Sequence, residues 1–157
     1  MDDFAAFFDK HRRPLVFALW VVARNQAEAE EVAQDAFLKV WERWDRISNM
    51  DDPEGYLFRT AMNLQRNRRR RAAMALRRTM RQLGPRDEIS EVESRDEVMR
   101  ALGGLTRSQR QALVVTDLLD HSSEEAGQIL GIRASTVRVH VARARAALKE
   151  QMGAHRD

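Results

Sequence analysis

The sequence predicts an all-α protein of two small helical domains joined by a linker. Apolar residues recur every three or four positions along most of the chain, which is the spacing of one helix face, and no segment alternates as a strand would. Glycine and proline are scarce, at 7 and 3 of 157 residues, as is common in helical globular proteins. The periodicity stops over 79–97, where a basic sequence becomes acidic and contains Gly, Pro and Ser. We therefore expect domains at 1–78 and 98–157.

Three helices are predicted in the first domain. The first covers about residues 1–25, where Pro14 places a bend or a fresh start. The second covers 27–47, with acidic first turns and a basic last turn that suit the helix dipole. Its apolar stripe consists of Val32, Ala36, Val40 and Trp44, widened by Ala33, Phe37 and Trp41. The third begins at Pro53, since proline is tolerated in a first turn. Its predicted core side consists of Tyr56, Leu57, Thr60, Ala61 and Leu64.

An arginine-rich block, NLQRNRRRR at 63–71, follows the apolar side of this third helix. Like charges placed side by side repel each other, so the block is either a solvated helix end or a surface for an anionic partner. The formal net charge is only +3, but clustering sets the local field. A polyanion such as nucleic acid is the simplest explanation for the block.

The second domain is predicted to begin with a capped helix and to end in two more. Thr106, followed three residues later by Gln109, forms a capping box. The core side of this helix consists of Leu105, Leu113 and Leu118. Ser122 with Glu125 caps a short helix over 122–130, and a longer basic helix covers 134–152.

These last two helices and the Gly131–Ile132 turn between them predict a helix-turn-helix. The residues expected to pack against Ile129 and Leu130 are Val137, Val141, Ala144 and Leu148. The outward residues are Arg138, Val139, Ala142, Arg143 and Arg145, with Ser135 and Thr136 at the helix start, where N–H groups can meet a phosphate. Such a helix fits the DNA major groove, although a basic surface helix without a ligand has the same pattern.

Several classes of protein are disfavoured. The chain has no cysteine, so it contains no disulfide or thiolate metal site, and its four histidines lack metal-binding spacing. The apolar run after Pro14 is too short to span a membrane, and the N-terminus is a poor signal peptide. No nucleophile motif or phosphate-binding glycine loop is present. We expect neither an enzyme nor a bound cofactor.

Three segments, AEEVAQDAFLKVWERW, PEGYLFRTAMNLQRNRRRR and the stretch from LTRSQRQALVV to ARARAALKE, resemble the extracytoplasmic-function (group IV) sigma factors of bacterial RNA polymerase. The resemblance covers nearly the whole chain outside the linker. It implies a region 2-like bundle and a region 4-like helix-turn-helix, which bind core polymerase and read the −10 and −35 promoter elements. It also implies a bacterial cytoplasmic protein without membrane insertion. The implied partners are the β′ clamp helices, the β flap, promoter DNA and an anti-sigma factor.

The resemblance assigns roles to particular residues. The polymerase-binding positions would be Glu31, Gln34, Asp35 and Leu38. The −10 contacts would be Asn49, Met50, Arg59, Asn63, Arg66, Asn67, Arg68 and Arg70, with the first two in a loop that captures an unstacked base. The −35 contacts would be the outward residues of the last helix. From the residues alone, the acids of 27–47 could equally serve only to solvate that helix.

The chain departs from the family pattern at four positions. Asn67 stands where an aspartate is usual, Val139–His140 where Ser-Arg is frequent, and Gly127 where alanine is usual. These changes leave the −35 sequence open. Two other functions also remain open: a freestanding helix-turn-helix regulator that binds paired half-sites as a dimer, and an adaptor or inhibitor that mimics a sigma factor.

Overall fold

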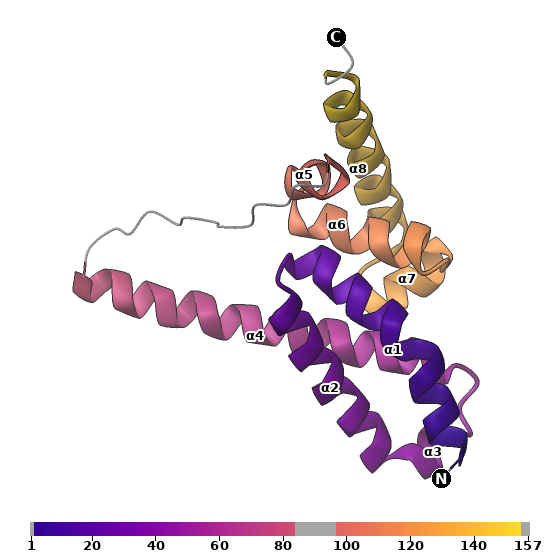
Figure 1. The fold of residues 1–157 in the computed structure, drawn as a ribbon. Coiled ribbons are helices and arrows are strands. Elements are labelled where there is room, and N and C mark those ends of the chain that lie inside the picture. Colours follow the sequence, from indigo (N-terminus) through magenta and orange to yellow (C-terminus); the bar gives the residue numbers. More distant parts are fainter. Residues whose placement is uncertain (1, 84–96, 155–157) are drawn as a thin grey trace.

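Helices account for most of the chain that the computed structural model describes, residues 2–83 and 97–154 (Figure 1). The first half contains α1 (Asp2–Ala23), α2 (Gln26–Glu42), α3 (Trp44–Ile47) and α4 (Pro53–Leu83). The second half contains α5 (Glu97–Gly103), α6 (Arg107–Leu113), the π-helix η1 (Val114–Leu118), α7 (Ser123–Leu130) and α8 (Ala134–Ala154). The described residues include no strand, and the predicted all-α class is confirmed.

α1, α2 and α4 surround the apolar core of the first half. α1 passes through Pro14 without interruption and buries Leu15 and Leu19 completely. Asn25 caps α2, because its side chain accepts a hydrogen bond of 3.0 Å from the backbone N–H of Glu28. The buried face of α2 consists of Ala29, Val32, Ala33, Ala36, Phe37 and Val40, in agreement with most of the predicted stripe.

The prediction of one helix over 27–47 is wrong at its C-terminal end. The backbone of Arg43 leaves the helical region, with a φ of −123°, so that α2 ends at Glu42 and Trp44 begins α3. Trp41 is 42% exposed. The ring of Phe4 packs edge-on against both tryptophans, at centroid distances of 4.8 Å and 5.3 Å. This aromatic cluster closes one end of the first half.

The buried face of α4 is wider than predicted and displaced around the helix. Its buried hydrophobic residues are Leu57, Phe58, Ala61 and Met62. Three of the predicted core residues, Tyr56, Thr60 and Leu64, are only half-buried. Gln65 is fully buried, and its Nε2 donates a hydrogen bond of 3.0 Å to the backbone oxygen of Leu19. The displacement leaves Tyr56 and Thr60 accessible on one side of α4.

α4 also continues to Leu83, beyond the helix end that the sequence predicts near residue 78. The predicted linker over 79–97 therefore overlaps the last turns of α4 and the first residue of α5. The remainder of that linker, residues 84–96, lies outside the described residues.

The start of the second half follows the prediction except at Leu118. Thr106 and Gln109 form the predicted capping box through hydrogen bonds of 3.0 Å and 3.2 Å. Leu105 is buried and Leu113 half-buried, but Leu118 is 46% exposed. The chain widens into the π-helix η1 just before Leu118, which changes the helical register. The prediction of Leu118 as a core residue is wrong.

The helix-turn-helix has the predicted form. Ser122 caps α7 by accepting a hydrogen bond of 3.1 Å from the N–H of Glu125. α7 ends at Gly131, whose φ of 70° is favourable for glycine. A Cβ on Gly127 would lie 2.7 Å from the backbone oxygen of Ile132, so this close approach requires a glycine. α8 then buries Val137, Val141 and Ala144 as predicted, whereas Leu148, which was predicted on the same face, is only half-buried.

The two halves pack directly against each other, in what we call the closed arrangement (Figure 1). α7 lies on α4, and α6 and η1 lie on α1. The apolar core runs without interruption from Phe58 in the first half to Val115 and Ile129 in the second. Across this contact, Arg66 Nη2 donates a hydrogen bond of 2.8 Å to the backbone oxygen of Leu130. The part of α4 beyond this contact projects away from the body.

Acidification is expected to weaken the fold through His11. This side chain is 6% exposed and lies beside Phe7 and Phe58, at centroid distances of 4.5 Å and 6.4 Å. Burial lowers the pKa of His11 below its ordinary value, although Glu54 opposes this effect. The unfolded chain therefore binds the proton first, and stability falls below about pH 6.5, by at most about 1.4 kcal/mol per pH unit.

Urea unfolding of the wild type and His11→Leu between about pH 8 and pH 5 checks this expectation. The free energy of unfolding should depend less on pH in the variant, because the leucine cannot bind a proton. Equal pH dependence in the two proteins would show that His11 does not contribute.

Candidate nucleic-acid interface

α8 presents most of its predicted recognition face to solvent. The exposed members are Ser135, Arg138, Val139, Ala142, Arg143 and Arg145. Thr136 is half-buried in the first turn. Because Val137, Val141 and Ala144 anchor the opposite side of the helix against α6 and α7, this face has a fixed orientation. Its width and charge suit entry into a DNA major groove.

Two arginines on α8 pair with carboxylates of neighbouring helices. Arg138 Nη1 lies 3.2 Å from a carboxylate oxygen of Glu124 in α7. Arg145 binds Asp117 of η1 through two hydrogen bonds, of 2.6 Å and 3.1 Å. The bonds to Asp117 raise the pKa of Arg145. Arg145 is therefore directed toward η1, at the flank of the predicted face. Arg138 is held by one exposed ion pair, which would have to break before this side chain could bind DNA.

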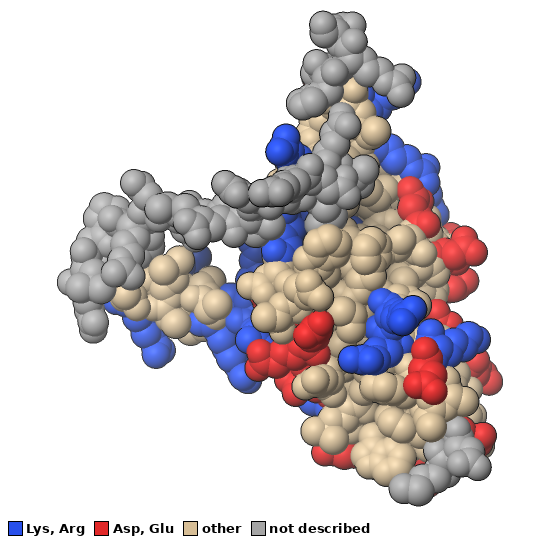
Figure 2. Space-filling view, viewed as in Figure 1, with Lys and Arg blue, Asp and Glu red and all other residues tan. Residues whose placement is uncertain are grey.

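The predicted DNA-binding residues of α4 fall into two groups. Arg59, Asn63, Asn67 and Arg70 are exposed, whereas Arg66 and Arg68 are half-buried. Arg66 is occupied by the carbonyl of Leu130 described above. Arg68 forms a 2.8 Å ion pair with Glu31 of α2. Figure 2 shows Lys and Arg side chains gathered along the projecting part of α4.

A polar hollow of about 320 Å³ lies between α2 and α4. Asn63 and Asn67 contribute to its wall from α4. The other polar residues of the wall were not predicted as binding residues, and two of them, Tyr56 and Thr60, were predicted to lie in the core. They are Lys39, Glu42, Arg43, Tyr56 and Thr60. The spacing of Tyr56, Thr60, Asn63 and Asn67 along one side of a helix is a signal that could have revealed this site. Its polar groups are suited to binding the edge of a nucleobase.

The loop between α3 and α4 holds one exposed candidate and one that is already bonded. Met50 is 39% exposed. The Nδ2 of Asn49 donates a hydrogen bond of 2.7 Å to the backbone oxygen of Asp45, and so stabilises the end of α3. Asp52 accepts a hydrogen bond of 2.8 Å from the N–H of Gly55 in the first turn of α4. These bonds fix the loop at both ends and leave Met50 at its exposed middle.

The predicted polymerase-binding residues form an exposed strip on α2. Glu31, Gln34 and Asp35 are exposed, and the Leu38 side chain is exposed by 56%. The hydrogen bond from Arg68 lowers the pKa of Glu31. All four residues lie on the side of α2 away from its buried face.

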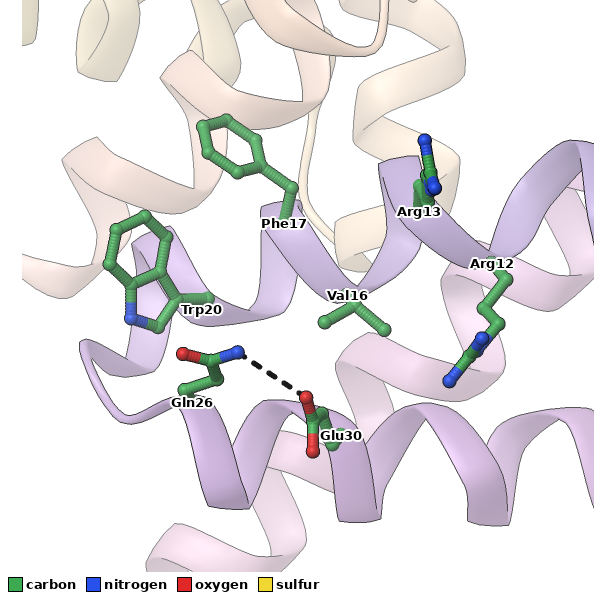
Figure 3. A pocket seen from close by; sticks show the side chains of 7 residues that line it. All are labelled: Arg12, Arg13, Val16, Phe17, Trp20, Gln26 and Glu30. Atoms are coloured by element: carbon green, nitrogen blue, oxygen red, sulfur yellow. Dashed lines mark hydrogen bonds between the residues drawn. The ribbon is translucent and has the colours of Figure 1, made fainter.

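Two further hollows meet at Phe17 and Trp20 on the other side of α1. One, of about 410 Å³, lies between α1 and α2; Figure 3 shows Arg12 and Arg13 at one end and the bonded pair Gln26–Glu30 on α2. The other, of about 420 Å³, is apolar and lies against η1 and α8. Phe17 is 46% exposed between them. The described ranges contain no three-residue His, Cys, Asp or Glu group suited to a metal ion, and none of their helices could cross a membrane.

Each half of the chain matches a known protein family. The family described as Sigma-70 region 2 matches residues 7–74, and Sigma-70, region 4 matches residues 95–148. The chain belongs to the sigma-70 family. Together, the two matches cover the first half and the helix-turn-helix in the order that the structure shows.

Curated relatives place the chain in the extracytoplasmic-function group. It is 29% identical to the ECF RNA polymerase sigma factor SigM of Mycobacterium tuberculosis, over 96% of this chain and 77% of the relative. It is 27% identical to the ferric citrate uptake sigma factor FecI of Escherichia coli, over 80% of this chain and 78% of the relative. As a sigma factor, the protein confers promoter specificity in transcription initiation and is a regulatory subunit.

Two solved structures share the fold. The sigma factor RpoE of Bartonella quintana, in complex with the anti-sigma factor NepR, gives a TM-score of 0.81 at 21% identity over 98% of both chains. CnrH, in complex with the cytosolic domain of CnrY, gives a TM-score of 0.66 at 26% identity, over 96% of this chain and 88% of CnrH. The family binds RNA polymerase and promoter DNA.

Proposed function

We propose that α4 reads the −10 promoter element, that α8 reads the −35 element, and that the exposed strip on α2 binds core RNA polymerase. The observation that carries this assignment is the orientation of α8. Its apolar residues are fixed against α6 and α7, so that Arg138, Val139 and Arg143 point away from the body. The corresponding domains are 1–78 and 98–157, joined over 79–97.

At the −10 element, the hollow between α2 and α4 would receive one unstacked base. Taking a base out of the stack costs a few kcal/mol, which a fitted pocket recovers. Asn63 and Asn67 supply donors and acceptors for a base edge, while Arg59 and Arg70 bind the flanking phosphates. Met50, exposed in the loop before α4, is placed to occupy the gap in the stack.

The proposed partners follow from these surfaces. The strip on α2 would bind the β′ clamp helices, and the second half would bind the β flap, in the bacterial cytoplasm. An anti-sigma factor is a further proposed partner, since the two solved neighbours are sigma factors held by anti-sigma proteins. The exposed Phe17 and the apolar hollow that lies against η1 and α8 offer such a protein a surface.

Promoter reading requires the closed arrangement to open. Elements centred roughly 25 base pairs apart are about 85 Å apart along DNA, at about 3.4 Å per base pair. The whole of α4, at about 1.5 Å per residue, is only about 46 Å long. In the closed arrangement α7 lies on α4, so the two reading helices are held together. Separation also frees Arg66 from the carbonyl of Leu130.

Reconstitution tests the proposal. Purified core polymerase with this protein should produce promoter-specific transcripts that core alone does not. A freestanding regulator would instead footprint duplex DNA without polymerase, and a sigma mimic would bind core yet reduce initiation. Either result would replace the proposed assignment.

Combined Gln34→Ala and Asp35→Ala substitutions are expected to weaken association with core polymerase roughly tenfold, through the loss of two exposed polar contacts. Because neither side chain is buried, the thermal unfolding midpoint should not change. Glu30→Ala is the matched control: it removes an acid from the same helix, but one that bonds Gln26 beside a different hollow. Core binding equal in the double variant and the control would place the docking surface elsewhere.

A further inference from the structure

A hollow of about 340 Å³ between the two halves is lined mainly by arginine. Its charged residues are Arg24, Arg68, Arg69, Arg107, Arg110 and Glu28. Three of the arginines come from α4 and the end of α1, and two come from α6. We call it the arginine hollow. It exists only in the closed arrangement, because each half supplies part of the wall.

The positive charge of the arginine hollow exceeds what its own carboxylates neutralise. Arg68 is paired with Glu31. Arg110 donates from Nε to the backbone oxygen of Val22 and from Nη1 to that of Leu105, at 3.2 Å and 2.6 Å, and these neutral oxygens do not neutralise its charge. Among the described residues, Glu28 is the single carboxylate that lines the hollow beside the remaining arginines.

Two buried donors in this cluster have no partner among the residues that the structure describes. The Nε of Arg24 and the Nη2 of Arg107 are both inaccessible to solvent and make no hydrogen bond to residues 2–83 or 97–154. Leaving a buried donor unpaired costs about 1–3 kcal/mol, and more for a charged group. Burial, and then the positive charge of Arg69, lowers the pKa of Arg107 to about 10. The closed arrangement thus gathers like charges that an anion would neutralise.

The size of the arginine hollow restricts the anion. A DNA duplex is far too large to enter it, whereas pockets for small ligands have about 300–1,000 Å³. Guanidinium groups match phosphate oxygens two at a time. The arginines come from three helices. A short chain of phosphates can contact all of them, whereas a single phosphate cannot.

We propose that the arginine hollow binds a compact anion of the di- or triphosphate class, and that the bound anion stabilises the closed arrangement. A ligand that binds one of two arrangements shifts the equilibrium toward it. The anion would link α1 and α4 to α6, and so oppose the separation that promoter reading requires. The regulatory part rests on the proposed function, but the binding part does not, since Arg69 and Arg107 are not among the proposed DNA contacts.

Calorimetric titration of the full-length protein tests the binding. The probes are inorganic phosphate, inorganic triphosphate and adenosine triphosphate. We expect one triphosphate per chain, bound roughly tenfold or more tightly than phosphate because several charge-assisted bonds replace one. Adenosine triphosphate binding more tightly than inorganic triphosphate would identify a nucleotide as the ligand, and equal affinity would identify the phosphate chain alone. Phosphate binding as tightly as triphosphate would overturn the proposal.

Variants distinguish triphosphate binding in the arginine hollow from non-specific attraction of triphosphate to the positive charge of the protein. Arg69→Gln and Arg107→Gln should each weaken triphosphate binding roughly tenfold, as expected for one lost charge-assisted contact. Arg77→Gln, an exposed arginine of α4 outside the hollow, is the matched control and should bind normally. Arg69 is exposed, so its variant should fold even if that of Arg107 does not. Equal affinity of Arg69→Gln and Arg77→Gln would overturn the proposal.

A second measurement tests whether bound triphosphate stabilises the closed arrangement. The chain has no cysteine, so Ala27→Cys and Lys149→Cys give one spin label on each half. Triphosphate should narrow the distribution of label distances and favour one distance, and Arg69→Gln should abolish this change. Binding without any change in the distribution would overturn the regulatory part. Promoter reading does not enter either measurement, so failure here is distinguishable from failure of the proposed function.

Discussion

Binding of the assembled polymerase to a promoter is expected to weaken roughly 10³- to 10⁵-fold between 50 mM and 200 mM salt, if 6–10 phosphates are contacted. The proposed contacts of both halves include exposed arginines, which are Arg59 and Arg70 in α4 and Arg138 and Arg143 in α8. Each guanidinium that meets a phosphate displaces bound counterions, and added salt opposes that release. The affinity for a promoter fragment, measured across this range of salt, gives the dependence as a slope.

Single substitutions should change that slope in a predictable way. Arg59→Gln and Arg70→Gln should each reduce it by about one, because each removes one phosphate contact. Arg13→Gln removes an exposed arginine of α1 and should leave the slope unchanged. A slope that is the same in all three variants would remove α4 from the DNA interface.

Arg138→Ala and Arg143→Ala are expected to reduce initiation from a −35-dependent promoter by about 1–3 kcal/mol for each lost base contact. This corresponds to a loss of roughly 5- to 150-fold. Both side chains are exposed on the face of α8 opposite Val137, Val141 and Ala144. Arg145→Ala should have a smaller effect, because Asp117 already binds that guanidinium through two hydrogen bonds.

Paired templates make this measurement specific. Transcripts are compared from a promoter with its −35 element and from one in which that element is scrambled. The wild type should lose activity on the scrambled template, whereas the two variants should be nearly indifferent to it. Lys149→Ala, on the same helix, is the control and should behave as the wild type does. Retained −35 preference in Arg138→Ala and Arg143→Ala would mean that another face of α8 meets DNA.

The helix-turn-helix could be predicted from the sequence because each of its signals is local. Ser122 caps α7, Gly131 ends it, and the apolar residues of α8 have one regular spacing. In α4 the same reasoning fails, since this helix packs against α1 and α2 on one side and α7 on another. Its buried face is therefore broad, and spacing alone does not show where it is centred. The end of α2 at Glu42 could not be predicted, because no glycine or proline lies near Arg43 in the sequence.

The exposed residues of a candidate site could be predicted from the sequence where all of them lie on one face of one helix. The outward residues of α8 follow directly from the periodicity that buries its opposite side. The strip on α2 was predicted only through the family resemblance, because acids on a helix can equally serve to solvate it. Sites made by several helices could not be found in this way. Arg24, Arg69 and Arg107 are distant in the sequence, and only the packing of α1, α4 and α6 brings them together.

The ion pair between Glu31 and Arg68 joins a residue proposed for polymerase with one proposed for DNA. If polymerase binds Glu31 first, Arg68 becomes available to DNA, and if DNA binds Arg68 first, Glu31 becomes available to polymerase. Each binding event therefore assists the other. Such cooperativity is reciprocal: polymerase raises the affinity for promoter by the same factor that promoter raises the affinity for polymerase. Because solvent screens an exposed pair, this cooperativity is weak. Sigma factor that has not found polymerase would thus bind DNA slightly less well than the complete enzyme does.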